Sequence, residues 1–256
     1  GADGRSLYDQ LLDYFSVEIA QNSADLAEIY HVRYRVYCEE FGYEPKDAFV
    51  NREESDEFDD RSLHCMVRHR ESGRVAAVSR VVTVTGEQLM PIEAHCAEHL
   101  DDAFFSKFAD RRDTVCEISR LAVDGDFRRR RGESETRYGD TDALAAGPGE
   151  RRTFPLLGLS SMLCAFAYAS LNGRPHLFAI MEPFLPVILR RSGIHLTRVG
   201  EDFEHRGTRA PYYLDTTNFE ERMRGDVREF YTHINDSLRD YVPDNGLPGA
   251  REARCA

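Results

Sequence analysis

The chain has 256 residues, a formal net charge of −12 and 41% hydrophobic residues. This length fits one α/β domain, the apolar content excludes a disordered chain, and the acidic balance argues against nucleic acid as a partner. No stretch reaches the ~20 apolar residues that span a bilayer, and the first residues lack a secretory signal pattern. The six cysteines are scattered without a CxxC pair. We therefore expect reduced thiols and a cytoplasmic protein.

The first part of the chain predicts a strand over residues 15–21 and a helix over residues 24–42. Spacings of three and four residues place Arg33 and Tyr37 in the apolar stripe of that helix. A buried arginine requires a carboxylate partner. The next charged stretch is NREESDEFDD, residues 51–60, which carries six acids in ten positions. Taken alone, such a run is typical of a solvated loop.

The middle of the chain predicts an antiparallel hairpin and a further strand. Residues 63–70 and 74–84 flank the turn sequence ESG, and Arg80 shares the inward face of the second strand with its valines. Residues 91–108 have a helical pattern. Residues 115–123, VCEISRLAV, form the next strong strand signal.

The second half begins with a stretch rich in Gly, Arg and Asp that predicts a long loop over residues 126–154. The expected elements after it are a helix over 155–171, a central strand over 176–181, a short helix over 182–193, closing strands within 194–200 and 211–216, a helix over 217–240 and a tail over 243–256. This order predicts an α/β fold in one domain over residues 1–256, with a core at about 15–215. A mixed, mostly antiparallel sheet would carry helices on both faces.

Three arginines point inward in this scheme, and four acids are candidates to meet them. The arginines are Arg33, Arg80 and Arg120, and the acids are Glu54, Asp56, Asp59 and Glu117. Glu117 and Arg120 are three residues apart, so a regular strand would send them to opposite faces. Both can serve one cleft only if the strand is bulged between them. The sequence therefore predicts a bulge near Ser119.

These residues resemble a known family. RYRVY (33–37), ESDEFD (54–59), VSR (78–80) and EISR (117–120) match in order and spacing the core of the autoinducer synthases, which make N-acyl-homoserine lactones. N-acyl amino acid synthases share their acetyltransferase-like (GNAT) architecture. The chain is most similar to the PEP-CTERM/exosortase-associated acyltransferases, through VYCEEFGYEP, EISRLAV followed by FRRR, MEPFLPVILRRSGI and VGEDFEHRGTRAPYYLD. Together these motifs span about residues 15–215.

The resemblance implies transfer of a fatty acyl group from a pantetheine thioester to a primary amine. The amine must be neutral to attack, so a carboxylate has to take its proton, and the candidates are Glu54, Asp56 and Glu117. It further implies a substrate-binding network made of Arg33, Tyr37, Asp59, Arg80, Ser119 and Arg120. Backbone N–H groups of a splayed strand near Leu121, Ala122 and Val123 would stabilise the oxyanion and receive the pantetheine arm.

On the donor side, four consecutive arginines follow the central strand, where this fold binds the cofactor diphosphate. They are Arg128, Arg129, Arg130 and Arg131. The pattern Arg129-x-x-Gly132 departs from the usual loop because Ser134 replaces the final small residue. An acidic acyl carrier protein is therefore the expected partner, with acyl-CoA as the alternative donor. Helix 155–171 and strand 176–181 could wall the acyl-chain pocket, or could serve only as core.

Other interpretations stay open. Asp59 and Arg80 could simply brace the acidic loop, because buried ion pairs are often structural. The protein could be a catalytically silent module that binds a carrier protein or acyl chains, or a plain acetyl-CoA N-acetyltransferase. His95 and His99 are four residues apart, but without further ligands we expect no metal. The sequence leaves open the amine, the acyl length, the choice between carrier protein and CoA, and the oligomeric state.

Overall fold

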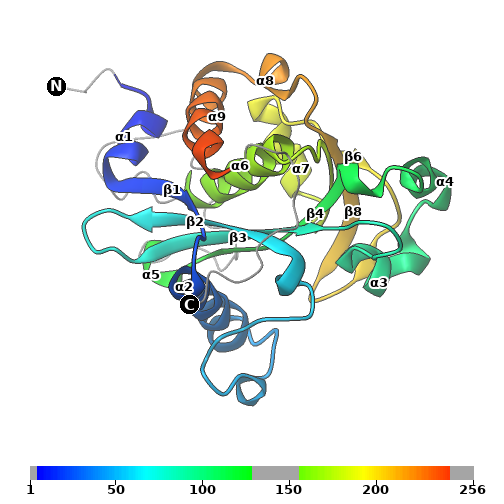
Figure 1. The fold of residues 1–256 in the computed structure, drawn as a ribbon, viewed down its shortest axis with the longest axis horizontal. Coiled ribbons are helices and arrows are strands. Elements are labelled where there is room, and N and C mark those ends of the chain that lie inside the picture. Colours follow the sequence, from blue (N-terminus) through cyan, green and yellow to red (C-terminus); the bar gives the residue numbers. More distant parts are fainter. Residues whose placement is uncertain (1–4, 129–155, 243–256) are drawn as a thin grey trace.

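The structure is a computed structural model that describes residues 5–128 and 156–242. Within these ranges one sheet holds the strands in the order β1-β2-β3-β4-β5-β8-β6, and β7 pairs with β8 at its side (Figure 1). The strands are β1 Phe15–Ile19, β2 Ser62–His69, β3 Val75–Thr83, β4 Val115–Val123, β5 His176–Met181, β6 Thr197–Arg198, β7 Phe203–Glu204 and β8 Thr208–Asp215. All neighbours pair antiparallel except β4 and β5, which run parallel. The expected mixed, mostly antiparallel sheet is confirmed.

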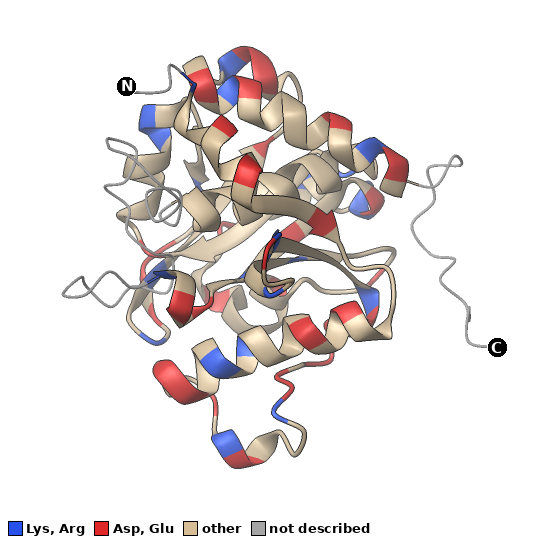
Figure 2. Ribbon diagram, turned by 90° about the vertical axis from the view of Figure 1, so that its left-hand side faces the viewer, with Lys and Arg blue, Asp and Glu red and all other residues tan. Residues whose placement is uncertain are grey.

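Helices cover both faces of this sheet. They are α1 Leu7–Tyr14, α2 Ser23–Tyr34, α3 Pro91–Cys96, α4 Asp102–Phe105, α5 Gly125–Arg128, α6 Leu156–Leu171, α7 Leu185–Leu189, α8 Phe219–Arg222 and α9 Gly225–Leu238. Figure 1 shows α1, α6 and α9 on one face of the sheet, with α2 and α5 on the other. Acidic and basic residues gather on the outer helices and loops, whereas the central strands are largely uncharged (Figure 2).

The apolar sequence runs explain this layering. α6 is buried along almost its whole length between the sheet and α9, as expected for a helix with no polar face. β5, HLFAIM, is a continuous apolar run, and that is typical of a strand covered on both faces. Its alternate side chains divide between two cores: Leu177 and Ala179 pack toward α6, while Phe178 packs with α3 and α4 on the opposite side.

Some predicted helices are interrupted. The helix expected over 24–42 is α-helical only to Tyr34 and continues as a π-helical turn, Arg35–Glu40. The wider turn buries three successive side chains, Val36, Tyr37 and Cys38, which an α-helix would spread over different faces.

The single helical stretch expected over 91–108 is divided: α3 ends at Cys96 and a 3-10 turn, Ala97–His99, follows. Asp101 then caps a new helix, with its Oδ1 accepting from the N–H of Phe104 at 3.1 Å. The helix expected over 217–240 divides into α8 and α9 at Met223–Arg224.

Three further predictions concern a short strand, the long loop and the C-terminal tail. The strand within 194–200 is only two residues long, Thr197–Arg198. The loop predicted from 126 begins later, because Gly125–Arg128 forms α5, and the remainder up to 155 lies outside the described residues. The predicted tail, 243–256, also lies outside them. Across the described residues, no helix is long and apolar enough to cross a bilayer.

Candidate active site

A bulge in β4 shapes the centre of the sheet. Arg80 of β3 pairs with Ser119, but Val78 pairs with Ala122, so Ser79 lies opposite two residues of β4, Arg120 and Leu121. Arg120 adopts a φ of 52°, the left-handed region that non-glycine residues rarely enter. The bulge predicted near Ser119 is confirmed. It allows Glu117 and Arg120 to line the same cavity.

The cavity lies where β4 and β5 separate. The two strands pair only over Val115–Glu117 and His176–Phe178, and beyond these residues they diverge. A cavity of about 350 Å³ occupies the gap. Because both Phe178 and Ala179 line it, and neighbouring side chains of a strand point to opposite faces, the cavity reaches both faces of the sheet.

One arm of the cavity is apolar and lies on the α6 face. Its walls come from α6, β5, α7, β8 and the segment before β6, and include Met162, Phe166, Leu177, Met181, Leu185, Leu196, Tyr212 and Leu214. The sequence left open whether α6 and β5 wall a pocket or serve only as core. Side chains of both elements line this cavity as well as contributing to the core.

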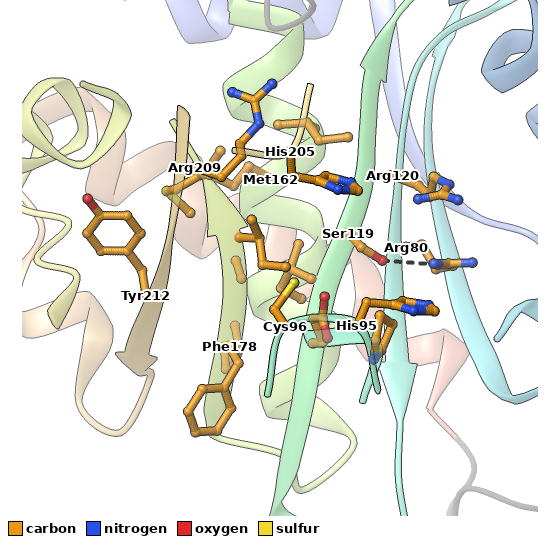
Figure 3. A pocket seen from close by; sticks show the side chains of 18 of the residues that line it. Arg80, His95, Cys96, Ser119, Arg120, Met162, Phe178, His205, Arg209 and Tyr212 are labelled. Atoms are coloured by element: carbon orange, nitrogen blue, oxygen red, sulfur yellow. Dashed lines mark hydrogen bonds between the residues drawn. The ribbon is translucent and has the colours of Figure 1, made fainter. Parts of the chain in front are cut away.

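The other arm is polar, and residues far apart in the sequence meet there. Its walls include Tyr37, Glu44, Asp56, Phe58, Arg80, His95, Cys96, Glu117, Ser119, Arg120, His205, Arg206 and Arg209. Figure 3 shows Arg80, Ser119 and Arg120 beside β4, with His95 and Cys96 near its lower part and Arg209 and His205 near the upper end. The polar arm therefore joins the acid–arginine set to the divergence of β4 and β5.

Three arginines and three acids form a network along the polar arm, as the sequence predicted. Arg33 is fully buried and donates from Nε to Glu54 at 2.5 Å and from Nη1 to Asp59 at 2.6 Å. Arg120 donates from Nε to the other oxygen of Glu54 at 3.2 Å and from Nη2 to Asp56 at 2.8 Å. Glu54, itself only 1% exposed, is thus held on both oxygens and does not line the cavity.

Arg80 completes the network and connects it to the bulge. Its Nη1 donates to Asp56 at 2.5 Å and to Asp59 at 2.9 Å, and its Nε donates to the hydroxyl of Ser119 at 3.1 Å (Figure 3). Burial by itself would raise the pKa of Asp56, but the hydrogen bond and charge of Arg80 and the charge of Arg120 outweigh it and lower that pKa. Burial opposes Arg33 in the same way at Asp59, and the pKa of Asp59 is again lowered. Asp56 and Asp59 are therefore ionised at neutral pH.

Glu117 is the exception among the four acids. It is 2% exposed, and its Oε2 accepts from the backbone N–H of Ile92 at 2.7 Å. Burial raises its pKa to about 8, against the opposing effects of that N–H and of the charge of Arg80. A carboxyl group that titrates near neutral pH inside a cavity is suited to exchange protons with a bound ligand.

The remaining predicted network residue, Tyr37, is held against the bulge. Its hydroxyl donates to the carbonyl of Leu121 at 2.9 Å, and the guanidinium of Arg120 lies 5.7 Å from its ring centroid. Leu121 lines the cavity, while Ala122 and Val123 are fully buried and pair with β3.

The basic run predicted for donor binding is described only at its first residue. Arg128 pairs with Glu40 and lies 4.8 Å from the ring centroid of Phe41, so its guanidinium is already engaged. Arg129, Arg130 and Arg131 lie outside the described residues.

Sequence reasoning assigned no role to the turn between β7 and β8, although its motif was noted. Arg206, with a φ of 55°, pairs with Glu44 and lies 5.6 Å from the ring centroid of Tyr43. Arg209 is 2% exposed and pairs with Glu182. The turn thus connects the β5–β8 half of the sheet to the segment after α2. The signal available in the sequence was the density of basic residues in EHRGTR.

The two histidines weighed as metal ligands do not converge. His95 lines the cavity with its ring 5.6 Å from Phe58, whereas the ring of His99 stacks on Phe203 at 4.8 Å. In the part of the chain that the structure describes, no group of three or more His, Cys, Asp or Glu residues could hold a metal ion.

The splayed, mostly antiparallel sheet with helices on both faces is a GNAT-like fold. In agreement, residues 32–136 match the family model described as an acetyltransferase (GNAT) domain. No curated protein sequence matches the chain.

Three solved structures illustrate the likeness. The CoA-dependent acyl-homoserine lactone synthase BjaI, with SAM and isopentyl-CoA, has a TM-score of 0.54 at 18% identity, covering 88% of this chain and 89% of that one. FeeM, an N-acyl amino acid synthase from uncultured soil microbes, gives 0.54 at 11%, covering 84% and 97%. The AHL synthase LasI gives 0.51 at 15%, covering 80% and 91%. At these identities the shared feature is the fold.

Proposed function

We propose that the protein is an N-acyltransferase that moves a fatty acyl group from a pantetheine thioester to the amine of an amino acid or similar small molecule. The observation that carries this proposal is the position of Glu117, a buried carboxyl group with a pKa near 8, in a cavity that also has an apolar arm. The splay of β4 and β5 would receive the thioester, and the polar arm would receive the amine.

In this proposal Glu117 is the general base. An amine arrives at neutral pH as an ammonium ion, whose charge favours the ionised form of a nearby carboxyl group. Glu117 then takes a proton from the ammonium, and the neutral amine attacks the thioester carbonyl. Backbone N–H groups near Leu121 would stabilise the oxyanion before the pantetheine thiolate leaves.

We assign a different task to the acids of the network. Asp56 lines the cavity as an ionised carboxylate, so it can orient the ammonium group. Glu54 is enclosed by Arg33 and Arg120, and its predicted role as a base stays a prediction with less support than Glu117. Asp59 would hold Arg33 and Arg80 in place.

The apolar arm supports a fatty acyl donor over acetyl. An acetyl group is too small to contact the apolar walls formed by Phe166, Leu185 and Leu214, whereas a fatty acyl chain can fill the space between them. The donor would be an acyl carrier protein or acyl-CoA, and the acidic carrier would dock through the arginines that follow Arg128, because Arg128 itself is paired with Glu40. Membership of the PEP-CTERM/exosortase-associated branch belongs to the same proposal.

The test is direct product detection. Purified protein is mixed with acetyl, octanoyl or palmitoyl donors, carried by CoA or by acyl carrier protein, and with a panel of amino acids and simple amines. Thiol release and mass spectrometry then report N-acyl products. We expect amides from long-chain donors, and their loss in Glu117→Gln. Glu98→Gln is the matched control, because that carboxylate is exposed.

The opposing results are equally clear. Tight acyl binding without any amide would favour a silent binding module, and activity confined to acetyl-CoA would favour a plain N-acetyltransferase. Full activity in Glu117→Gln would exclude Glu117 as the base.

A further inference from the structure

The chemistry of the proposed reaction releases one proton per turnover. An ammonium ion loses two protons on its way to an amide, the departing thiolate takes one, and the other must reach solvent. Glu117 is 2% exposed, so it cannot hand a proton to bulk water directly. The proton must therefore leave through the cavity that Glu117 lines, by way of water or of a side chain that reaches solvent.

The helix α3 supplies a residue in the right position. The backbone N–H of Ile92 donates to Glu117, and His95 follows about one turn later in the same helix. Both Glu117 and His95 line the cavity, and His95 is exposed to solvent. Figure 3 shows His95 close to Arg80 and Ser119 in this cavity.

The helix itself is firmly anchored. Glu93 accepts from the N–H of Met90 at 2.8 Å and pairs with Arg112, whose Nη1 donates to it at 2.7 Å. This ties the first turn of α3 to the turn Arg112–Thr114 that precedes β4, and so fixes the position of the backbone that carries His95.

We propose that His95 relays the proton from Glu117 to solvent, an inference that rests on the proposed function. Imidazole suits this task because it accepts a proton on one nitrogen and releases one from the other near neutral pH. In the described residues the His95 ring makes an edge contact with Phe58 but no hydrogen bond, so its nitrogens can bind water. The proton passes from the Glu117 carboxyl through water to the imidazole and on to solvent, which restores the carboxylate.

The charged and titratable groups around this route come from four elements. Glu117 faces Glu93 and Cys96 of α3, Arg80 of β3, Arg120 of β4 and Arg61 of the turn Asp59–Arg61. Asp56 and Arg80 line the same arm as His95. The pKa of Asp56 is lowered by its arginines, so this carboxylate stays ionised beside the route and does not take up the proton.

The first experiment compares His95→Gln with His99→Gln. His99 lies just beyond α3, is stacked on Phe203 and is absent from the cavity wall, so it is the matched control. In His95→Gln we expect kcat to fall about tenfold or more, with little change in either KM, because relayed proton transfer contributes on the scale of general acid–base catalysis. Added imidazole should restore kcat in His95→Gln but not in Glu117→Gln. An unchanged kcat, or a loss that imidazole does not restore, would overturn the proposal.

A second measurement needs no turnover, so the relay and the proposed function can fail separately. After a rapid pH increase, infrared spectroscopy follows loss of the protonated carboxyl band of Glu117, identified by its absence in Glu117→Gln. We expect deprotonation to slow about tenfold or more in His95→Gln and to be unchanged in His99→Gln. Equal rates in wild type and His95→Gln would refute the relay even in a protein that forms no amide.

Discussion

The pH dependence of activity provides the sharpest test of Glu117. Burial raises its pKa to about 8, and the base must be ionised to accept a proton. Each pH unit below that value reduces the ionised fraction about tenfold, so about one molecule in a hundred is ready at pH 6. We therefore expect kcat/KM to rise about a hundredfold from pH 6 to a plateau above about pH 8.

Thiol release at low substrate concentration measures this profile. Two acceptors whose amines differ in pKa should share the same acidic limb, because kcat/KM reports the free enzyme. Glu117→Gln should lose the limb together with about 10²–10⁴-fold of the rate, the usual contribution of a general base. Glu98→Gln should retain both.

Two results would refute the reasoning. A limb that moves with the pKa of the amine would report substrate ionisation alone. A limb that persists in Glu117→Gln, or that centres near the ordinary glutamate value of 4.5, would show that burial does not tune this group as we infer.

Three further predictions concern stability and specificity. Burial raises the pKa of Glu117 from 4.5 to about 8, so protonation of Glu117 stabilises the folded protein fully below pH 4.5, and this stabilisation is lost as the pH rises through 8. In urea unfolding, the wild type should lose roughly 5 kcal/mol of stability relative to Glu117→Gln over that range, and parallel curves for the two proteins would contradict this. Asp59→Asn should lower the free energy of unfolding by about 3–5 kcal/mol, because it removes the buried carboxylate that Arg33 and Arg80 share, while the exposed control Asp60→Asn should change it little; equal effects would contradict the network. Phe166→Trp should shift donor preference toward shorter acyl chains, since the larger side chain fills part of the apolar arm; an unchanged preference would show that the acyl chain does not bind there.

Most of the sheet could be predicted from the sequence because its strands carry strong local patterns. The strand predicted at 115–123 is β4, residue for residue, and its bulge followed from the spacing of Glu117 and Arg120. The interruptions of helices are harder to predict, because they depend on contacts with residues that are distant in the sequence. The π-helical turn Arg35–Glu40 is an example, since its burial pattern needs the sheet beneath it.

The site was predicted in composition but not in its electrostatics. Inward-facing arginines require carboxylates, so the meeting of Arg33, Arg80 and Arg120 with the acidic loop could be expected. That the acids differ in state could not, because the pKa of Glu117 depends on a burial that only the packing of α3 creates. The contact between Arg206 and Glu44 joins residues 162 positions apart, beyond any local pattern.

The short seam between β4 and β5 has a mechanical consequence. In the described residues β4 and β5 pair only over Val115–Glu117 and His176–Phe178, so few backbone hydrogen bonds join the two halves of the sheet, and the core beside α6 holds them together on one face. The ion pair between Arg206 and Glu44, both of which line the cavity, adds a side-chain link between the halves. A ligand that binds in the cavity would contact both halves of the sheet, so the free energy of unfolding should rise as the cavity becomes occupied.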